Sequence, residues 1–351
     1  MQKQYRAEFF TREYEYMAHR ITTNPAPRLD YLTLENISFE MPKITGVENS
    51  FVQIVSHENK VSYQGIVKSV KDSAGVSTVH VTPLLSLLDV TVNYDRTLLQ
   101  TGSVENFIKK VILDHYRDNT DTLQNILGVN CIVTSSTPTK LNIKSNVHAF
   151  WDICTRSLTE YGVVVDASFD VAKKQIVFTI GKIPSKITIE TGLKNCLNKN
   201  IIVGETTGSL NKATYINKDN EAEAVTYYLH TNGKVDTENR DRIYPVEFKT
   251  EYVEGDDFQS DALARAYEDL TPKQYNNLIE LDYAIGDKLI SPENIKIGTV
   301  AQIIAGEEIL ESVLTGTEVT GNIITLIFGF VRLDFTKIFA IERRKSNASK
   351  A

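Results

Sequence analysis

Residues 323–333, IITLIFGFVRL, form the stretch that best indicates the fold. Apolar residues occupy both alternating sides of this predicted strand. One face carries Ile324, Leu326, Phe328 and Phe330. The opposite face carries Ile323, Ile327, Val331 and Leu333. A surface strand alternates apolar and polar residues, so this strand should be covered on both sides. We therefore expect the first set of residues to lie either in the core of a closed barrel or at a contact between subunits.

The residues around this strand predict an antiparallel meander over 282–336. Turns are expected at Gly286-Asp287 and Gly321-Asn322, because glycine reaches the positive φ values of tight turns. Residues 307–315, EEILESVLT, are compatible with a short helix, but the threonines and glycines after Leu314 favour a strand. A last short helix is predicted over 334–343.

The N-terminal part of the chain is predicted to be almost entirely strands. Residues 29–40 and 51–56 read as strands, and 61–70 pairs with 76–82 through a turn at 71–75. Short strands at regular spacing, with turn residues between them, are typical of a small barrel or sandwich.

Residues 101–184 have a different pattern, which predicts a compact α+β unit. Ser103 is suited to cap a helix that continues through VENFIKKVILDHYRD. A second amphipathic helix is predicted over 147–161, ending at Gly162. We expect both helices to pack on a hairpin of strands 163–167 and 175–180.

Strands return after residue 184. Asn232-Gly233 predicts a hairpin turn. Residues 258–270 read as a helix, with a further helical turn over 272–279. One face of the helix is predicted to carry Leu263, Ala266, Tyr267 and Leu270. The predicted fold class is α+β, β-rich and multidomain: a first β-barrel domain at 1–100, an inserted helix-plus-strand domain at 101–184, and a second β-barrel domain at 185–351 with a helical insertion near 257–279.

The composition is that of a globular protein and argues against several function classes. The 351 residues are 42% hydrophobic and 24% charged, with a net charge of −7. This charge argues against tight binding of nucleic acid, although not against a surface that DNA only passes. Three unpatterned cysteines predict neither a disulfide framework nor a zinc site, and indicate a reducing cytoplasm. We expect no signal peptide and no stable membrane insertion.

The chemical motifs favour a protein that is not an enzyme and binds no cofactor or metal. His148, Asp152 and Cys154 are close in sequence, but Cys154 lies on the apolar face of its predicted helix. Asp114-His115 is interpreted as a solvated helix end. An acidic run is better suited to cap a helix than to hold a cation; it comprises Glu251, Glu254, Asp256, Asp257 and Asp261. Trp151 is expected in the core, and the basic tail after Arg343 in solvent.

Taken in order, several segments resemble the baseplate hub family of tailed bacteriophages, including the N-terminal hub part of tail-associated lysins. They are YQGIVKSVKDSAGVSTVHVTPLLSLLDV (63–90), SVENFIKKVILDHY (103–116), HAFWDICTRSLTEYGVVV (148–165), VTYYLHTNGKV (225–235), YAIGDKLI (283–290), IKIGTVAQII (295–304) and VTGNIITLIFGFVR (319–332).

The resemblance implies a homotrimer in which each chain supplies two similar tube domains, so that three chains form a pseudo-sixfold ring. Such a hub joins a distal tail or tail-tube protein to tip, spike or receptor-binding proteins, and genomic DNA passes through it. It is located in the virion tail tip or baseplate and assembled in the host bacterial cytoplasm. No lytic residues of the family have matching positions in this chain.

Two other functions stay open at this point. One is a cell-wall hydrolase that acts through residues 101–184 or the acidic run. The other is a carbohydrate- or receptor-binding tail protein that uses aromatic strands as its binding face. The missing catalytic motifs count against the hydrolase.

Overall fold

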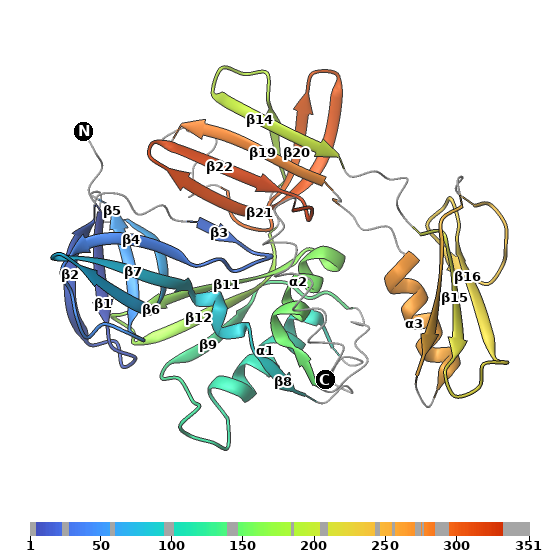
Figure 1. Ribbon diagram of the computed structural model, residues 1–351, viewed down its shortest axis with the longest axis horizontal. Helices are drawn as coiled ribbons and strands as arrows, with labels where there is room; N and C mark the ends of the chain where they lie inside the picture. The colour runs from blue at the N-terminus through green and yellow to red at the C-terminus, as the bar shows by residue number, and fades with distance from the viewer. Residues whose placement is uncertain are drawn as a thin grey trace. The chain divides into compact units, whose positions relative to one another are not determined.

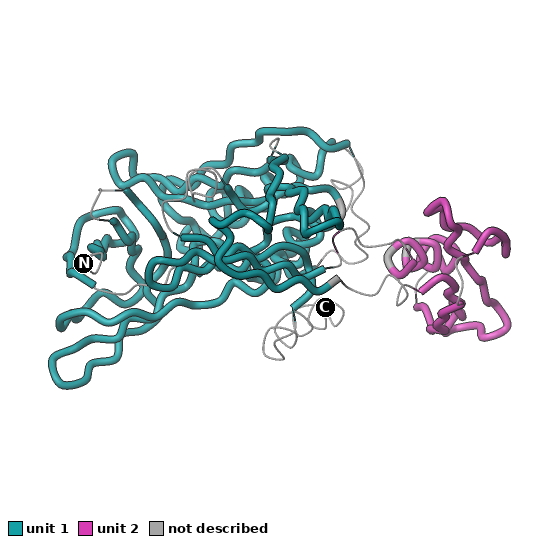
Figure 2. The backbone as a smooth tube through the Cα atoms, turned by 90° about the horizontal axis from the view of Figure 1, so that it is seen from above, with its two compact units in different colours: residues 1–141, 145–202, 277–351 teal, residues 142–144, 203–276 magenta. Residues whose placement is uncertain are grey.

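The chain forms two compact units in a computed structural model (Figure 2). The structure describes residues 5–22, 28–56, 60–94, 102–138, 147–183, 186–203, 210–242, 246–254, 257–270, 275, 277–284 and 295–332. Unit 1 comprises residues 1–141, 145–202 and 277–351, and unit 2 comprises 142–144 and 203–276. The predicted domain boundaries near 100 and 184 fall inside unit 1 and stay a prediction. The β-rich α+β class is confirmed.

The first sheet of unit 1 has six strands in the order β2-β1-β5-β6-β7-β4 (Figure 1). Its strands are β1 (Tyr5–Phe10), β2 (Tyr16–Thr22), β4 (Ile37–Pro42), β5 (Phe51–Ser56), β6 (Val61–Ser73) and β7 (Val76–Pro83). All of its neighbouring strands pair antiparallel. The predicted hairpin is confirmed, but its strands continue closer to the turn, which lies at Ala74 and Gly75.

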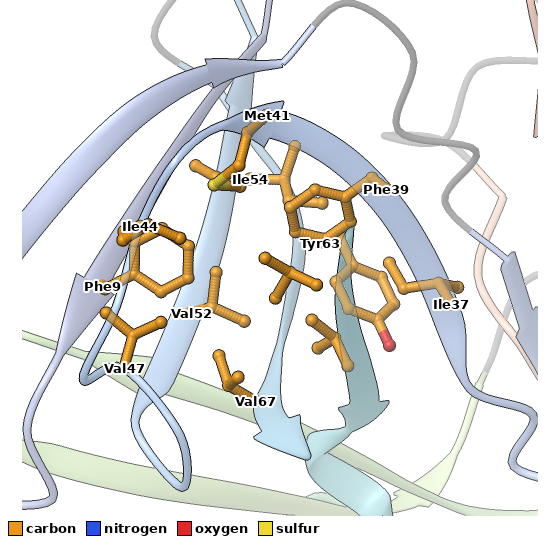
Figure 3. Close-up of a cluster of buried hydrophobic side chains, with 13 residues drawn as sticks. Phe9, Ile37, Phe39, Met41, Ile44, Val47, Val52, Ile54, Tyr63 and Val67 are labelled. Carbon is orange, nitrogen blue, oxygen red and sulfur yellow. The ribbon is translucent and has the colours of Figure 1, made fainter. Parts of the chain in front are cut away.

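The inner side of this sheet holds one apolar cluster, around which the strands curve (Figure 3). Phe9, Val52, Ile54, Val67 and Val79 are among its fully buried members. The alternation of buried and exposed residues in β4 and β7 points every second side chain into this cluster, as period-2 strands require.

The sheet is a half-barrel, and the β-barrel domain predicted for residues 1–100 stays a prediction. In the described residues no backbone ladder joins its edge strands β2 and β4. Side chains connect these edges instead. The hydroxyl of Thr22 donates to the carbonyl of Glu40 at 2.9 Å, and Arg20 Nε donates to the carbonyl of Lys43 at 3.2 Å.

The prediction of one strand over 29–40 is wrong. A short strand β3 (Arg28–Asp30) pairs with β21 (Glu308–Thr320) of another sheet, and a turn then separates it from β4. Leu34, at φ 50°, adopts the left-handed conformation in this turn. The alternating sequence pattern did not indicate the break between β3 and β4. The buried Asp30 pairs with Arg332, which is too distant in sequence to be part of that pattern.

The α+β part follows the prediction in outline. It contains η1 (Leu84–Leu88), β8 (Thr91–Asn93), α1 (Val104–Tyr116), β9 (Val129–Val133), β10 (Val147–Ala149), α2 (Phe150–Tyr161), β11 (Val163–Asp170) and β12 (Gln175–Lys182). Ser103 caps α1 by accepting a hydrogen bond from the Asn106 amide, and Gly162 ends α2 at φ 67°. Both helices contact the β11–β12 hairpin, which β9 extends in parallel.

The predicted start of α2 is wrong by three residues. Residues 147–149 form β10, which pairs with β8, and the helix begins at Phe150.

The C-terminal sheet has the order β13-β20-β21-β22-β19-β14, with β3 beside β21. Its strands are β13 (Lys186–Glu190), β14 (Cys196–Val203), β19 (Asn277–Ala284), β20 (Val300–Ala305), β21 (Glu308–Thr320) and β22 (Ile323–Phe328). The prediction of a strand over 307–315 is confirmed from Glu308, and the Gly321-Asn322 turn joins β21 to β22. The predicted helical turn at 272–279 is wrong from Asn277 onward, because β19 begins there.

Two further predictions lie outside the described residues: the turn at 286–287 and the helix at 334–343. Among the helices that the structure describes, none has the length and apolar character needed to span a bilayer.

Unit 2 consists of a four-stranded sheet, β17-β16-β15-β18, with one helix along one face (Figure 1). Its elements are β15 (Lys212–Asn217), β16 (Ala224–Leu229), β17 (Val235–Asp236), β18 (Phe248–Val253) and α3 (Phe258–Leu270). The Asn232-Gly233 turn lies between β16 and β17 as predicted. The predicted helix face is partly wrong: α3 buries Phe258, Ala262, Ala266 and Leu270, while Leu263 and Tyr267 are 38% and 49% exposed.

Candidate functional site

The apolar face of β22 lies inside the C-terminal sheet of a single chain. Ile324, Leu326 and Phe328 are at most 2% exposed and belong to one core cluster with Ile279 and Leu281 of β19. Phe330 follows the strand and is half-buried. The opposite face is covered only in part, since Ile327 is 2% exposed and Ile323 is 39% exposed. The predicted role of these side chains at a subunit contact or in a barrel core stays a prediction.

A buried polar junction lies at the end of this strand. Arg332 and Asp30 form an ion pair whose side chains are 2% and 0% exposed. Arg332 Nε donates to Asp30 Oδ2 at 2.9 Å, and Nη2 donates to Oδ1 at 3.1 Å. The guanidinium also donates to the Thr315 hydroxyl and to the carbonyls of Gly329 and Val331. We call these five residues the Asp30 junction.

A β-bulge places Thr315 in the Asp30 junction. The register between β21 and β22 shifts between Leu314 and Gly316, and this shift changes the direction of the intervening Thr315 side chain. Its hydroxyl donates to the Gly329 carbonyl at 2.6 Å. Gly329, at φ 82°, approaches the Asn277 backbone so closely that a Cβ would clash there. The junction therefore fixes the end of β22 against β3, about 300 residues away in sequence.

Tyr31 connects the same junction to α2 and β11. Its amide donates to the Thr315 carbonyl at 2.8 Å, and its hydroxyl accepts the Val165 amide at 3.1 Å. The indole of Trp151 donates to the Tyr31 carbonyl at 3.1 Å and packs on its ring at 4.7 Å. Trp151 is fully buried, as the sequence predicted. The C-terminal sheet, strand β11 of the three-stranded sheet and helix α2 are thus held together by one set of buried contacts.

Sequence reasoning did not identify the Asp30 junction. The signal was present, because Arg332 is the one charge in the apolar stretch 323–333. A charge buried among apolar residues has to be paired. Its partner could not be read from the pattern, since Asp30 belongs to a short segment that resembled an ordinary strand.

A second buried carboxylate fixes the start of α1. Glu105 accepts hydrogen bonds from the Ser135 hydroxyl at 2.7 Å and from the Thr137 amide and hydroxyl at 2.8 and 2.9 Å. Burial by itself would raise the pKa of Glu105, but these hydrogen bonds outweigh it and hold the pKa below the ordinary value. Glu105 therefore stays ionised and holds residues 135–137 against the helix.

The candidate nucleophile does not have the environment of a reactive thiol. Cys154 is fully buried, and burial raises the pKa of its thiol far above the ordinary value. His148 pairs with Asp152 at 2.9 Å, one turn of backbone away. The cysteine therefore packs as a small apolar residue, as the sequence indicated.

The predicted Asp114-His115 helix end is confirmed as partly solvated. Asp114 pairs with Lys110 at 2.7 Å with both side chains about half exposed, and His115 contacts the Gln124 amide. Partial burial lowers the pKa of His115.

The acidic run is divided between ion pairs and a helix cap. Glu251 pairs with Lys249 and Arg265, each at 2.7 Å, and Glu254 pairs with Lys218. Asp257 accepts the Ser260 amide at the start of α3, as helix capping requires. Asp256 and the basic tail after Arg343 lie outside the described residues. Within the described part of the chain, no cluster of three potential ligands could hold a metal ion.

Comparison with solved structures finds whole-chain similarity to phage proteins. A chain of the phage P2 baseplate, in its activated conformation with Ca, aligns at TM-score 0.54 and 13% identity, covering 93% of this chain and 98% of that one. The 43 kDa tail protein of prophage MuSo2 from Shewanella oneidensis aligns at TM-score 0.53 and 11% identity, covering 94% and 98%. Prophage tail protein gp18 from Listeria monocytogenes aligns at TM-score 0.50 and 12% identity, covering 99% and 100%.

This chain has the fold of phage baseplate and tail proteins. No protein-family model and no curated protein matches its sequence. The resemblance that the ordered segments indicated is therefore confirmed at the level of the fold. The alignments extend over nearly the whole length of both partners, so unit 2 and the α+β part belong to the shared architecture and are not additions to it.

Proposed function

We propose that the chain is a structural hub subunit of a phage tail tip or baseplate. The observation that carries this proposal is the whole-chain similarity to a baseplate chain and to prophage tail proteins. In this role three chains form a pseudo-sixfold ring that continues the tail tube, and the two β-sheets with separate apolar cores in each chain support this arrangement.

The ring joins a distal tail or tail-tube protein to tip, spike or receptor-binding proteins, and genomic DNA passes through its lumen. The net charge of −7 is consistent with a passage that does not retain DNA. The subunit is located in the virion and assembled in the host bacterial cytoplasm. It acts without catalysis, cofactor or metal.

The buried carboxylates and the buried cysteine among the described residues support a structural role rather than that of a hydrolase. Asp30 and Glu105 each bridge segments distant in sequence, and the buried Cys154 has a strongly raised pKa. Carboxylates that are fully engaged in structural hydrogen bonds have no free oxygen to act as a general acid or base.

The mass of the full chain in solution tests the proposal. Sedimentation equilibrium should give a homotrimer, and negative-stain images should show rings with a central opening. A chain that stays monomeric at all concentrations and also fails to join a ring with its tail-tube partner would contradict the hub. Release of soluble fragments from purified peptidoglycan would favour the hydrolase instead.

A further inference from the structure

The face of the unit 2 sheet opposite α3 has an unusual composition. Strands β16, β15 and β18 are paired in register there, so their outward side chains form three rows. The rows are Tyr228–Lys212–Phe248, Thr226–Thr214–Thr250 and Ala224–Ile216–Tyr252. We call these nine residues the open face.

Strand β18 is inverted relative to an ordinary surface strand. Its charged residues Lys249 and Glu251 point to the α3 side, where Glu251 pairs with Arg265 at 2.7 Å. Its aromatic residues point outward, and Phe248 and Tyr252 are 68% and 53% exposed. A sequence selected only for stability would place the rings under the helix and the charges in water. The exposed rings therefore indicate a binding surface.

The order of residue types on the open face indicates the class of ligand. Threonine hydroxyls form its middle row, in which Thr214 and Thr226 are hydrogen-bonded at 3.0 Å. Aromatic rings lie at its ends, and Phe248 and Tyr252 are separated along the strand by about 13 Å. Protein interfaces have the reverse order, with an apolar centre inside a polar rim. A polar middle between stacking rings suits a ligand rich in both hydroxyls and apolar C–H faces.

The charge of the open face favours a neutral ligand. Among the nine residues only Lys212 is charged, and its Nζ lies 5.8 Å from the centre of the Phe248 ring. Beside the first row, Asp236 is paired with Lys234 and His230, while Arg242 lies over the Tyr228 ring at 4.8 Å. A polyanion such as nucleic acid would require several free cations here.

A hollow adjoins the open face at Tyr252, where β15 and β18 end, and extends to Arg265 on the α3 side. Its volume is about 610 Å³, and it is lined by Lys218, Glu221, Tyr252, Glu254 and Arg265. Carboxylates that accept and cations that donate hydrogen bonds can both engage sugar hydroxyls.

We propose that the open face and its adjoining hollow bind a neutral oligosaccharide. The rings of Phe248 and Tyr252 stack on sugar rings, the threonine row donates and accepts hydrogen bonds between them, and the hollow holds the end of the chain of sugars. This proposal rests on the geometry of unit 2 and does not depend on the hub function.

The test uses the purified full chain with three tetrasaccharides as probes: β-1,4-linked N-acetylglucosamine, cellotetraose and maltotetraose. Saturation-transfer NMR at millimolar sugar should show binding of at least one probe. Phe248→Ala and Tyr252→Ala should each weaken that binding about tenfold, as expected for the loss of one aromatic contact. Thr214→Val should weaken it while keeping the shape of the face.

Tyr267→Ala is the matched control, because Tyr267 is a similarly exposed aromatic residue of unit 2 that lies on α3. This variant should bind the probe like the wild type. Equal melting temperatures of all variants would exclude unfolding as the cause of weaker binding. The proposal is overturned if no probe binds, if Phe248→Ala and Tyr252→Ala bind like Tyr267→Ala, or if Phe248→Ala changes the mass of the assembly, which would make the open face a protein contact.

Discussion

At the scale of single residues, the Arg332–Asp30 pair is expected to dominate the stability of unit 1. Arg332→Met leaves the Asp30 carboxylate buried without its partner, which should lower the free energy of unfolding by about 3–5 kcal/mol. Fluorescence of Trp151 can report the loss in urea titrations, because this single tryptophan contacts Tyr31 next to Asp30. Lys186→Met is the control: its ion pair with Glu311 is about half exposed and should contribute at most about 1 kcal/mol. Equal losses of unfolding free energy in Arg332→Met and Lys186→Met would contradict a dominant role of the Arg332–Asp30 pair.

Glu105 is expected to make unit 1 sensitive to acid. Its pKa is depressed in the folded chain, so its stabilising effect is complete above its ordinary value of 4.5 and is lost as the pH falls through the folded pKa. Glu105→Gln should therefore destabilise the protein by about 1–3 kcal/mol at pH 7, and the difference from wild type should shrink as the pH is lowered below that ordinary value. Urea titrations at pH values from 7 to below 4.5 measure this difference in unfolding free energy. Glu307→Gln, at an exposed position, should give a difference close to zero throughout.

At the scale of elements, the two faces of β22 should respond differently to truncation. Phe328→Ala removes a fully buried ring and should cost about 3–5 kcal/mol of unfolding free energy. Ile323→Ala, on the same strand but 39% exposed, should cost less than about 1 kcal/mol. The sequence also allowed a position of Phe328 at a subunit contact, and light scattering tests it. A Phe328→Asp chain that keeps its stability but loses its oligomeric mass would place this side chain at such a contact.

The elements that sequence patterns predicted are those that local interactions determine. Helix α1 begins after Ser103 and α2 ends at Gly162, because capping depends on neighbouring residues alone. Strand β10 was missed because Val147–Ala149 is extended only through its pairing with Thr91–Asn93. Strand β18 was not predicted, since the ion pairs that cover Lys249 and Glu251 come from α3. The open face therefore became recognisable only when the register of three strands was known.

At the scale of the whole molecule, assembly should depend on the edge of the half-barrel. Strand β2 forms one edge of the first sheet and exposes Tyr16, Met17 and Ile21 by 57%, 38% and 44%. Adjacent apolar side chains on an edge strand are a liability unless another chain covers them. If the proposed ring uses this edge, Ile21→Glu should weaken trimer formation at least about tenfold, because a buried carboxylate would lack a partner.

Sedimentation velocity over a range of protein concentrations measures this effect directly. Val76→Glu is the matched control, since Val76 is 42% exposed in the same sheet but lies beside the β6–β7 turn on β7, which β4 separates from the β2 edge. The control should assemble like the wild type, and both variants should keep the wild-type far-UV circular dichroism spectrum, because neither position is buried within the single chain. If Ile21→Glu assembles normally while Val76→Glu does not, the contact lies at the hairpin end of the sheet. The ring would then have to be built through that end, with the β2 edge left for the tail protein above or below it.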